Sequence, residues 1–149
     1  MISKEAGDFM SRWWTLFCVV VLGLTVTVAL TFAQAVNSEG WQVPADAAQK
    51  KNPLEASAKV IDQGKSLFKN YCQRCHGATG VGDGPDADPD HKPGNLTDAS
   101  RAASNPDGVM YYKIWNGRKQ PRMPAFKNDL TENEVWAIIR YATTLRKPS

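Results

Sequence analysis

Residues 72–76 read Cys72-Gln73-Arg74-Cys75-His76, and this C-x-x-C-H pattern decides how the rest of the chain is interpreted. Two thiols three positions apart on one helical turn can form thioethers with the two vinyl groups at one edge of a porphyrin. The adjoining His76 then lies under the iron as its proximal ligand. The motif therefore predicts one haem c, bound covalently through Cys72 and Cys75.

Two other kinds of site share part of this spacing. A thioredoxin-like dithiol needs its C-x-x-C within a βαβ context, but no strongly β-branched segment precedes Tyr71. A structural zinc site needs four ligands. This half of the chain holds no third cysteine and, beside His76, only one histidine, His91. Haem attachment is the better interpretation of the motif.

The residues on both sides of the motif extend the pattern. Gly64 and Phe68 precede it, and the segments that follow are Gly77-Ala-Thr-Gly80-Val-Gly82, Pro93-Gly-Asn-Leu96, Asn116-Gly117, Arg122-Met123-Pro124-Ala-Phe126 and Leu130-Thr131. In this order, the stretch from about residue 56 to 146 resembles the class I c-type cytochromes over one small domain. The resemblance implies an all-α class I cytochrome c fold, one haem and single-electron transfer.

The resemblance also implies roles for individual residues. Met123 matches the distal iron ligand of the family, and Pro93 matches the proline whose carbonyl accepts the Nδ1–H of His76. Leu96 would pack on the porphyrin face, and Phe68 and Arg122 complete the predicted haem pocket.

Two further residues are alternatives for the distal position. Met110 falls in a predicted helix, where a core position is the ordinary role, and His91 stands between Asp90 and Lys92, as surface histidines do. A Met ligand closes the iron and favours electron transfer. A labile or vacant distal site would instead indicate a haem enzyme, such as a peroxidase, or a gas sensor.

Hydrophobic periodicity predicts three helices in this region. The first runs from about residue 56 to 71 with an apolar face, and Gly64 on it leaves room for Ile138 and Tyr141 of the last helix. The second runs from about 106 to 115, with Asn105 as its N-cap. The third begins with the capping box Thr131-Glu-Asn-Glu134 and continues to about residue 146. Residues 77–104 are predicted to be mostly loop.

The N-terminal region carries an apolar run. Trp13 to Phe32 are 20 residues without a charge, which as a helix would span about 30 Å, the thickness of a hydrocarbon core. We therefore expect a cytoplasmic tail at 1–12, a transmembrane anchor at 13–35, a linker at 36–55 and the cytochrome c domain at 56–149. A signal peptide cleaved after Ala33-Gln34-Ala35 is the alternative, and it would release a soluble periplasmic carrier.

These expectations place the protein in the bacterial cytoplasmic membrane, with its haem domain on the periplasmic side. The arrangement resembles the mono-haem cytochrome c subunits of bacterial respiratory complexes such as alternative complex III. We expect membrane oxidoreductase subunits and an external redox protein as partners, and no nucleic acid.

The charges near Met123 bear on the external partner. The chain has a net charge of +3, and its basic side chains gather around this methionine: Lys113, Arg118, Lys119, Arg122 and Lys127. Such a group would steer an acidic partner to the haem edge. Alternatively, one or two of these residues bind the haem propionates. No nucleophile with a base, phosphate loop or carboxylate pair at helical spacing suggests substrate chemistry.

Overall fold

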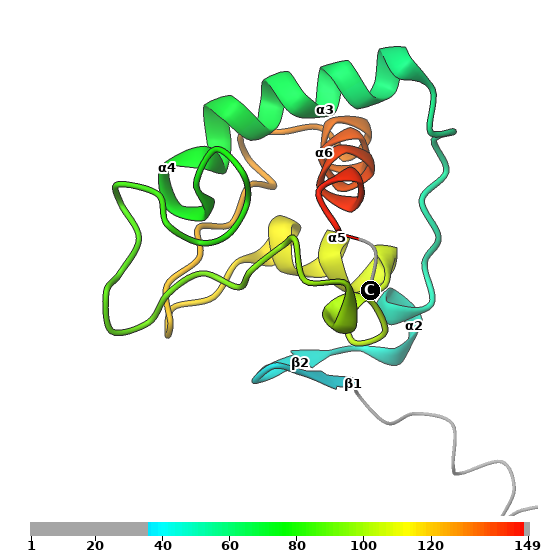
Figure 1. The fold of residues 1–149 in the computed structure, drawn as a ribbon. Helices are drawn as coiled ribbons and strands as arrows, with labels where there is room; N and C mark the ends of the chain where they lie inside the picture. Colours follow the sequence, from blue (N-terminus) through cyan, green and yellow to red (C-terminus); the bar gives the residue numbers. More distant parts are fainter. Residues whose placement is uncertain (1–35, 148–149) are drawn as a thin grey trace, which may run out of the picture. The chain divides into compact units, whose positions relative to one another are not determined.

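The computed structural model describes residues 36–147. Its elements are the strands β1 (Val36–Ser38) and β2 (Trp41–Val43), the helices α2 (Ala45–Ala48), α3 (Ala58–Tyr71) and α4 (Gln73–His76), the 3₁₀ helix η1 (Ala99–Ala102), and the helices α5 (Asp107–Asn116) and α6 (Glu132–Thr144) (Figure 1). The expected helical domain is present, with the addition of one antiparallel β-hairpin. The predicted tail and anchor lie outside the described residues. Between residues 36 and 147, no helix has the length and apolar character that a membrane crossing requires.

Helix α3 carries the haem-attachment motif at its C-terminal end. The side chain of Ser57 accepts a hydrogen bond from the Val60 N–H and caps the helix, which begins two residues later than predicted. Its last backbone bond runs from the Cys72 N–H to the Phe68 carbonyl, at 2.9 Å. The chain then enters α4 at once, so the two cysteines of the motif sit at the junction of two helices.

Helix α3 crosses α6 at a position without a side chain. In Figure 1, α3 lies across the view whereas α6 is seen almost end-on. A Cβ atom on Gly64 would collide with the backbone carbonyl of Ala137, and the Cβ of Tyr141 would lie 3.0 Å from it. The prediction of a gap filled from α6 is correct for Tyr141. At the contact, however, Ala137 takes the place expected for Ile138, which instead points into the core.

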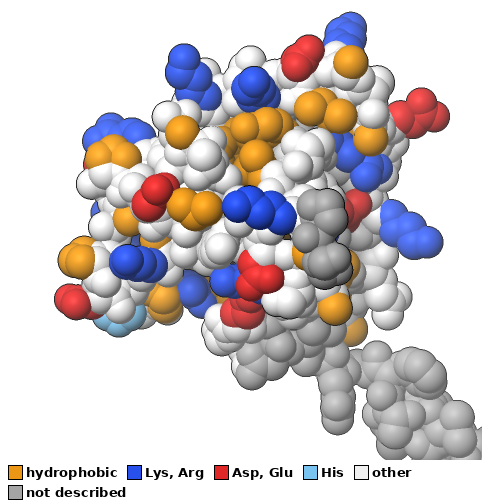
Figure 2. All heavy atoms as spheres, in the orientation of Figure 1, with side chains coloured by type: hydrophobic (Ala, Val, Ile, Leu, Met, Phe, Trp, Pro, Cys, Tyr) orange, Lys and Arg blue, Asp and Glu red, His pale blue; other side chains and the backbone are white. Residues whose placement is uncertain are grey.

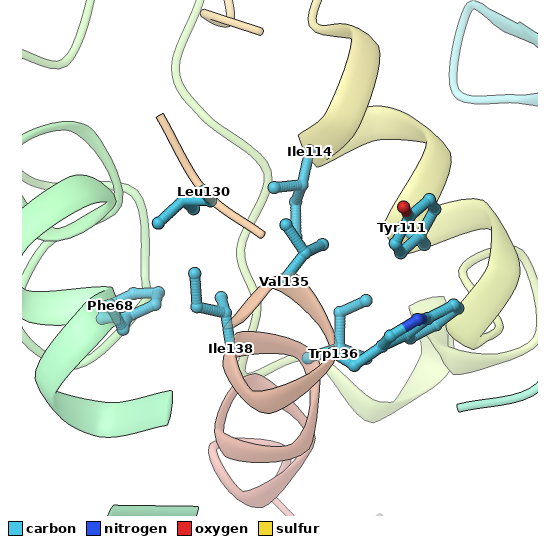
Figure 3. Packing of buried hydrophobic residues seen from close by; sticks show 8 residues of the cluster. Phe68, Tyr111, Ile114, Leu130, Val135, Trp136 and Ile138 are labelled. Atoms are coloured by element: carbon cyan, nitrogen blue, oxygen red, sulfur yellow. The ribbon is translucent and has the colours of Figure 1, made fainter. Parts of the chain in front are cut away.

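The main core lies between α3, α5 and α6 (Figure 3). Its buried side chains are Phe68, Tyr111, Ile114, Leu130, Val135, Trp136, Ile138 and Ile139. Tyr111 stacks on Trp136 with ring centroids 4.3 Å apart. The capping box that begins α6 is present as predicted: the Thr131 side chain accepts from the Glu134 N–H, and the Glu134 carboxylate accepts from the Thr131 N–H.

The N-cap predicted for α5 is wrong. The N-cap position is occupied by Pro106, which offers no side-chain hydrogen bond. Asn105 is used elsewhere: its Nδ2 donates to the Arg101 carbonyl at 3.1 Å, and its Oδ1 accepts from the Lys113 Nζ at 2.6 Å. The side chain therefore connects α5 to the preceding loop instead of satisfying the first turn of the helix.

The linker predicted at residues 36–55 is also wrong, because this segment is built into the domain. Trp41 is 7% exposed and Val43 is fully buried, and both pack against Val109 of α5. Further along, the Asn52 side chain donates to the Trp136 carbonyl at 2.9 Å. Arg140 of α6 donates to the Leu54 carbonyl at 2.7 Å. The segment has no helical periodicity, yet its apolar and polar groups find partners in α5 and α6.

Candidate haem-binding site

One cavity of about 320 Å³ lies beside the attachment motif. All eight residues predicted for the haem site line it: Phe68, Cys72, Cys75, His76, Pro93, Leu96, Arg122 and Met123. Several residues that the sequence did not indicate also line it: Glu39, Trp41, Tyr71, Arg101, Asn105 and Arg146. The cavity is thus formed by segments that lie up to 107 positions apart, between Glu39 and Arg146.

The loop after α4 holds the motif in place through backbone hydrogen bonds. The Gly82 N–H donates to the His76 carbonyl at 2.8 Å and the Asp86 N–H donates to the Arg74 carbonyl at 2.7 Å. Gly82 has φ +89°, and a Cβ there would collide with the Pro93 carbonyl. The glycine therefore allows the loop segment that carries Pro93 to approach the loop after α4 closely.

His76 is presented to the cavity as a neutral imidazole. Burial lowers the pKa of the His76 ring below its usual value, and this effect outweighs that of the nearby Gly94 backbone, which raises the pKa. The Nδ1 atom is buried, and it has no hydrogen-bond partner among the described residues, the Pro93 carbonyl included. Neutral imidazole is the form that coordinates a metal. The bond from His76 to Pro93 stays a prediction.

The two thiols of the motif are unsuited to dithiol redox chemistry. Burial, followed by the charge of Cys75, raises the pKa of a free Cys72 thiol to about 12. A reactive dithiol requires a lowered thiol pKa. Among residues 36–147, no three His, Cys, Asp or Glu side chains gather as a metal site would require. The described residues thus support neither the dithiol nor the zinc alternative.

Met123 is positioned by a loop that folds back between α5 and α6. Its backbone exchanges two hydrogen bonds with Arg118, at 2.8 and 2.9 Å. Gly117 makes this return possible: it has φ +59°, and a Cβ there would collide with the Met123 carbonyl. The Met123 side chain packs against both hydrophobic clusters of the domain.

The two alternatives to Met123 also line the cavity, in different settings. Met110 is half-buried, and its Sδ accepts a hydrogen bond from the Arg146 Nη2 at 3.5 Å. His91 is exposed, as expected, and its Nδ1 lies 3.4 Å from the Asp88 carboxylate. Both side chains thus have a polar partner of their own.

One part of the cavity wall carries a compact group of charges. The Glu39 carboxylate pairs with Arg101 at 2.5 Å and with Lys113 at 3.3 Å. The Arg118 guanidinium lies 4.5 Å from the centre of the Trp41 ring and donates to the Glu39 carbonyl at 3.3 Å. We call Glu39, Arg101, Lys113 and Arg118 the wall cluster. No sequence motif indicated it, because its members come from three separate segments.

The basic group expected around Met123 is correspondingly smaller. Lys113 is 8% exposed and Arg118 is half-buried, so neither belongs to an exposed ring of charge. Arg122, Lys119 and Lys127 remain exposed. Figure 2 shows Lys and Arg side chains spread over the visible face, with Asp and Glu among them, instead of gathered in a single patch.

These residues fit a covalently attached haem. Two cysteines, a neutral histidine with a buried free Nδ1, and a methionine sulfur converge on one cavity. Its wall is apolar at Phe68, Leu96, Ile114 and Ile138, and positively charged at the wall cluster. A haem would complement both parts of this wall, because it has an apolar macrocycle and two negatively charged carboxylates.

The sequence from residue 59 to 141, more than half of the chain, matches the family model described as "Cytochrome C oxidase, cbb3-type, subunit III". The chain belongs to this c-type cytochrome family. It accordingly binds a single covalent haem c and transfers electrons through it. No curated protein matches this cytochrome.

Two solved structures are similar to this cytochrome. The reducing HAO-like protein complex Kustc0457/Kustc0458 of Kuenenia stuttgartiensis is 29% identical, with a TM-score of 0.54 over 64% of this chain and 47% of that chain. The c-type cytochrome KustC0563 is 30% identical, with a TM-score of 0.46 over 56% of this chain and 98% of that chain. This cytochrome therefore spans less than half the length of the first of these proteins.

Proposed function

We propose that this cytochrome is a single-electron carrier whose haem iron is held by His76 and Met123. The observation that carries the proposal is the cavity itself, where a neutral imidazole at the end of α4 and an uncharged sulfur from the loop after α5 both line the wall. When bound, the haem supplies a one-electron ferric/ferrous couple. His/Met ligation raises the potential of that couple.

The chain's own residues shield the site and orient the ligands. Phe68 lines the same cavity, with its ring centroid 6.5 Å from that of His76. The bridge to Arg118 restricts the main chain at Met123. Both ligands would then keep their positions in the two redox states, which reduces the reorganisation that electron transfer requires.

The wider setting is part of the same proposal. Residues 13–35 are a single membrane anchor that holds the haem domain on the periplasmic side of a bacterial cytoplasmic membrane. The protein works with membrane oxidoreductase subunits and passes electrons to or from an external redox protein. The exposed Arg122, Lys119 and Lys127 near Met123 support an acidic contact surface on that partner.

The ligand assignment is tested by replacing each methionine of the cavity. In the Met123→Ala protein, we expect loss of the weak red-edge absorption band that reports a sulfur on ferric haem, and new binding of carbon monoxide to the ferrous form. Met110→Leu is the matched control and should retain the band, since the side-chain volumes are similar. The assignment fails if wild-type ferrous protein binds carbon monoxide readily, which would instead indicate an enzyme or sensor. It also fails if Met110→Leu alone removes the band.

The anchor is tested on the native protein. A retained span predicts a mature N-terminus at or near Met1 and a protein that stays with membranes in high salt, because salt screens surface charges but not apolar insertion. An N-terminus at Val36 would favour the soluble periplasmic carrier with a cleaved signal peptide.

A further inference from the structure

The tip of the β-hairpin holds an acidic residue in an unusual backbone conformation. Glu39 and Gly40 connect β1 to β2, and both have positive φ, +55° and +78°. Such two-residue turns favour Asn, Asp or Gly at the first position, because side chains rarely adopt positive φ. A glutamate here costs some stability, and its long side chain allows contacts that a shorter one would not reach.

Those contacts all lead to the haem cavity. The Glu39 carboxylate binds Arg101 of η1 and Lys113 of α5, while its backbone carbonyl accepts from Arg118. Burial by itself would raise the pKa of Glu39, but the hydrogen bond from Arg101 and the charge of Lys113 lower it below the usual value. The residue is therefore a carboxylate at neutral pH, and it neutralises one of the three positive charges in the wall cluster.

Glu39, on the hairpin, comes from a different part of the fold than the attachment motif at α4. In Figure 1, the hairpin lies at the lower edge of the described domain and α4 at the upper left. The carboxylates of a haem lie at the edge opposite its vinyl groups, which bind Cys72 and Cys75. Buried carboxylates require cationic partners. The wall cluster supplies three such partners together, and Lys92, Arg122 and Arg146 also line the cavity.

We propose that Glu39 is a positioning residue for the charged edge of the haem, which holds Arg101 and Lys113 at the cavity wall and lowers the reduction potential by offsetting their positive charge. The inference rests on the electron-transfer function proposed above. It assigns a redox role to the hairpin, which lies outside residues 59–141 that match the family. A negative charge beside the haem stabilises the ferric form more than the ferrous form.

The test is an equilibrium redox titration of full-length holoprotein at constant ionic strength. Glu39→Gln should raise the potential, with about a threefold to tenfold change in the ferric/ferrous equilibrium, where tenfold is 59 mV for one electron. Glu39→Asn should raise it similarly, and because Asn suits the turn, this variant provides the measurement if the first one folds poorly. Arg101→Gln should shift the potential in the opposite direction.

The control is Asp46→Asn, which removes the same charge from the nearby helix α2. Asp46 is exposed and does not line the cavity, so its loss should shift the potential much less. The proposal is overturned if Glu39→Gln and Glu39→Asn shift the potential no more than this control, or if Arg101→Gln raises it. The sulfur-to-iron band should persist in all four variants. If the wild type lacks this band, Met123 is not the ligand. The role of Glu39 is then still decided by the shifts in reduction potential.

Discussion

The α3–α6 crossing and the contact of the β-hairpin with α5 support the same cavity, but they are built differently. The crossing brings two backbones together at Gly64 and Ala137 and is flanked by Phe68 and Tyr141, whose ring centroids are 5.4 Å apart. In the hairpin contact, the Trp41 and Val43 side chains of β2 are buried, and the wall cluster adds ion pairs. One contact is close packing of apolar surface, and the other combines a small apolar core with ion pairs.

This difference decides how each contact responds to change. Close packing of backbone against backbone tolerates no added atom, whereas an ion-pair group responds to charge and pH. Substitutions of one kind should therefore damage one contact and leave the other nearly intact. Each free energy of unfolding is measured by urea titration of ferric holoprotein, because guanidinium is itself a salt that would screen the ion pairs of the wall cluster.

The largest effect is expected at Trp41. Trp41→Ala removes the main apolar side chain of the hairpin contact and the ring beneath Arg118, and it should lower the free energy of unfolding by about 3–5 kcal/mol. Val81→Ala, at an exposed valine, is the control and should change stability by less than about 0.5 kcal/mol. A loss below 1 kcal/mol at Trp41 would mean that the hairpin contributes no more than a linker.

The crossing should be the next most sensitive. Gly64→Ala places a methyl group against the Ala137 carbonyl, and overpacking of this kind should cost about 1–3 kcal/mol. The exposed neighbour is the matched control: Lys65→Ala should be nearly neutral. If Gly64→Ala stabilised the protein, as an ordinary exposed helix glycine would on replacement, the close approach of α3 and α6 would be refuted.

A smaller effect distinguishes the two helices of the crossing. Thr131→Ala removes the hydroxyl that accepts from the Glu134 N–H and donates to the Glu134 carboxylate, and it should cost about 0.5–2 kcal/mol. Ser57→Ala removes a single cap bond of 3.4 Å from α3 and should cost less. Equal losses in the two variants would show that the second bond of the Thr131 hydroxyl, to the Glu134 carboxylate, contributes nothing to α6.

The smallest effect concerns the charges of the wall cluster. The pKa of Glu39 is lowered in the folded state, so its stabilising contribution is present above its unfolded pKa and is lost as pH falls through the lower, folded value. The groups that face it are Arg101, Lys113 and Arg118. Glu39→Gln should therefore be less stable than the wild type by under about 1 kcal/mol at neutral pH, with the difference vanishing in acid. A difference that persists at low pH would show that the lost contribution is packing and not charge.

The crossing could be predicted from the sequence because its determinants are local. The periodicity of α3, the capping box at Thr131 and the C-x-x-C-H motif each lie within a few residues, and the structure confirms the two helices they indicate. The predicted haem residues also reach one cavity, because Met123 follows Gly117 and the motif follows Phe68 in the order typical of the family.

The hairpin contact could not be predicted, since every partner of it is distant in sequence. Glu39 lies 74 positions from Lys113, and a strand of three residues is too short to show a periodicity. The sequence predicts Lys113 as one of the charges around Met123, because it does not reveal that Glu39 of the hairpin pairs with this lysine and that its side chain is buried. Asn105 was misread for a similar reason: a residue type that suits a helix cap also suits a bond to Lys113.

The folded hairpin limits how far the haem can travel. If the 20 residues from 36 to 55 were a flexible coil, their two ends would lie on the order of 25 Å apart, and the domain could move over that distance in search of partners. These residues instead form strands and a helix and contact α5 and α6, so they do not act as a flexible tether. If residues 13–35 anchor the protein as proposed, residues 36–55 would therefore not lengthen the reach of the haem domain toward its partners.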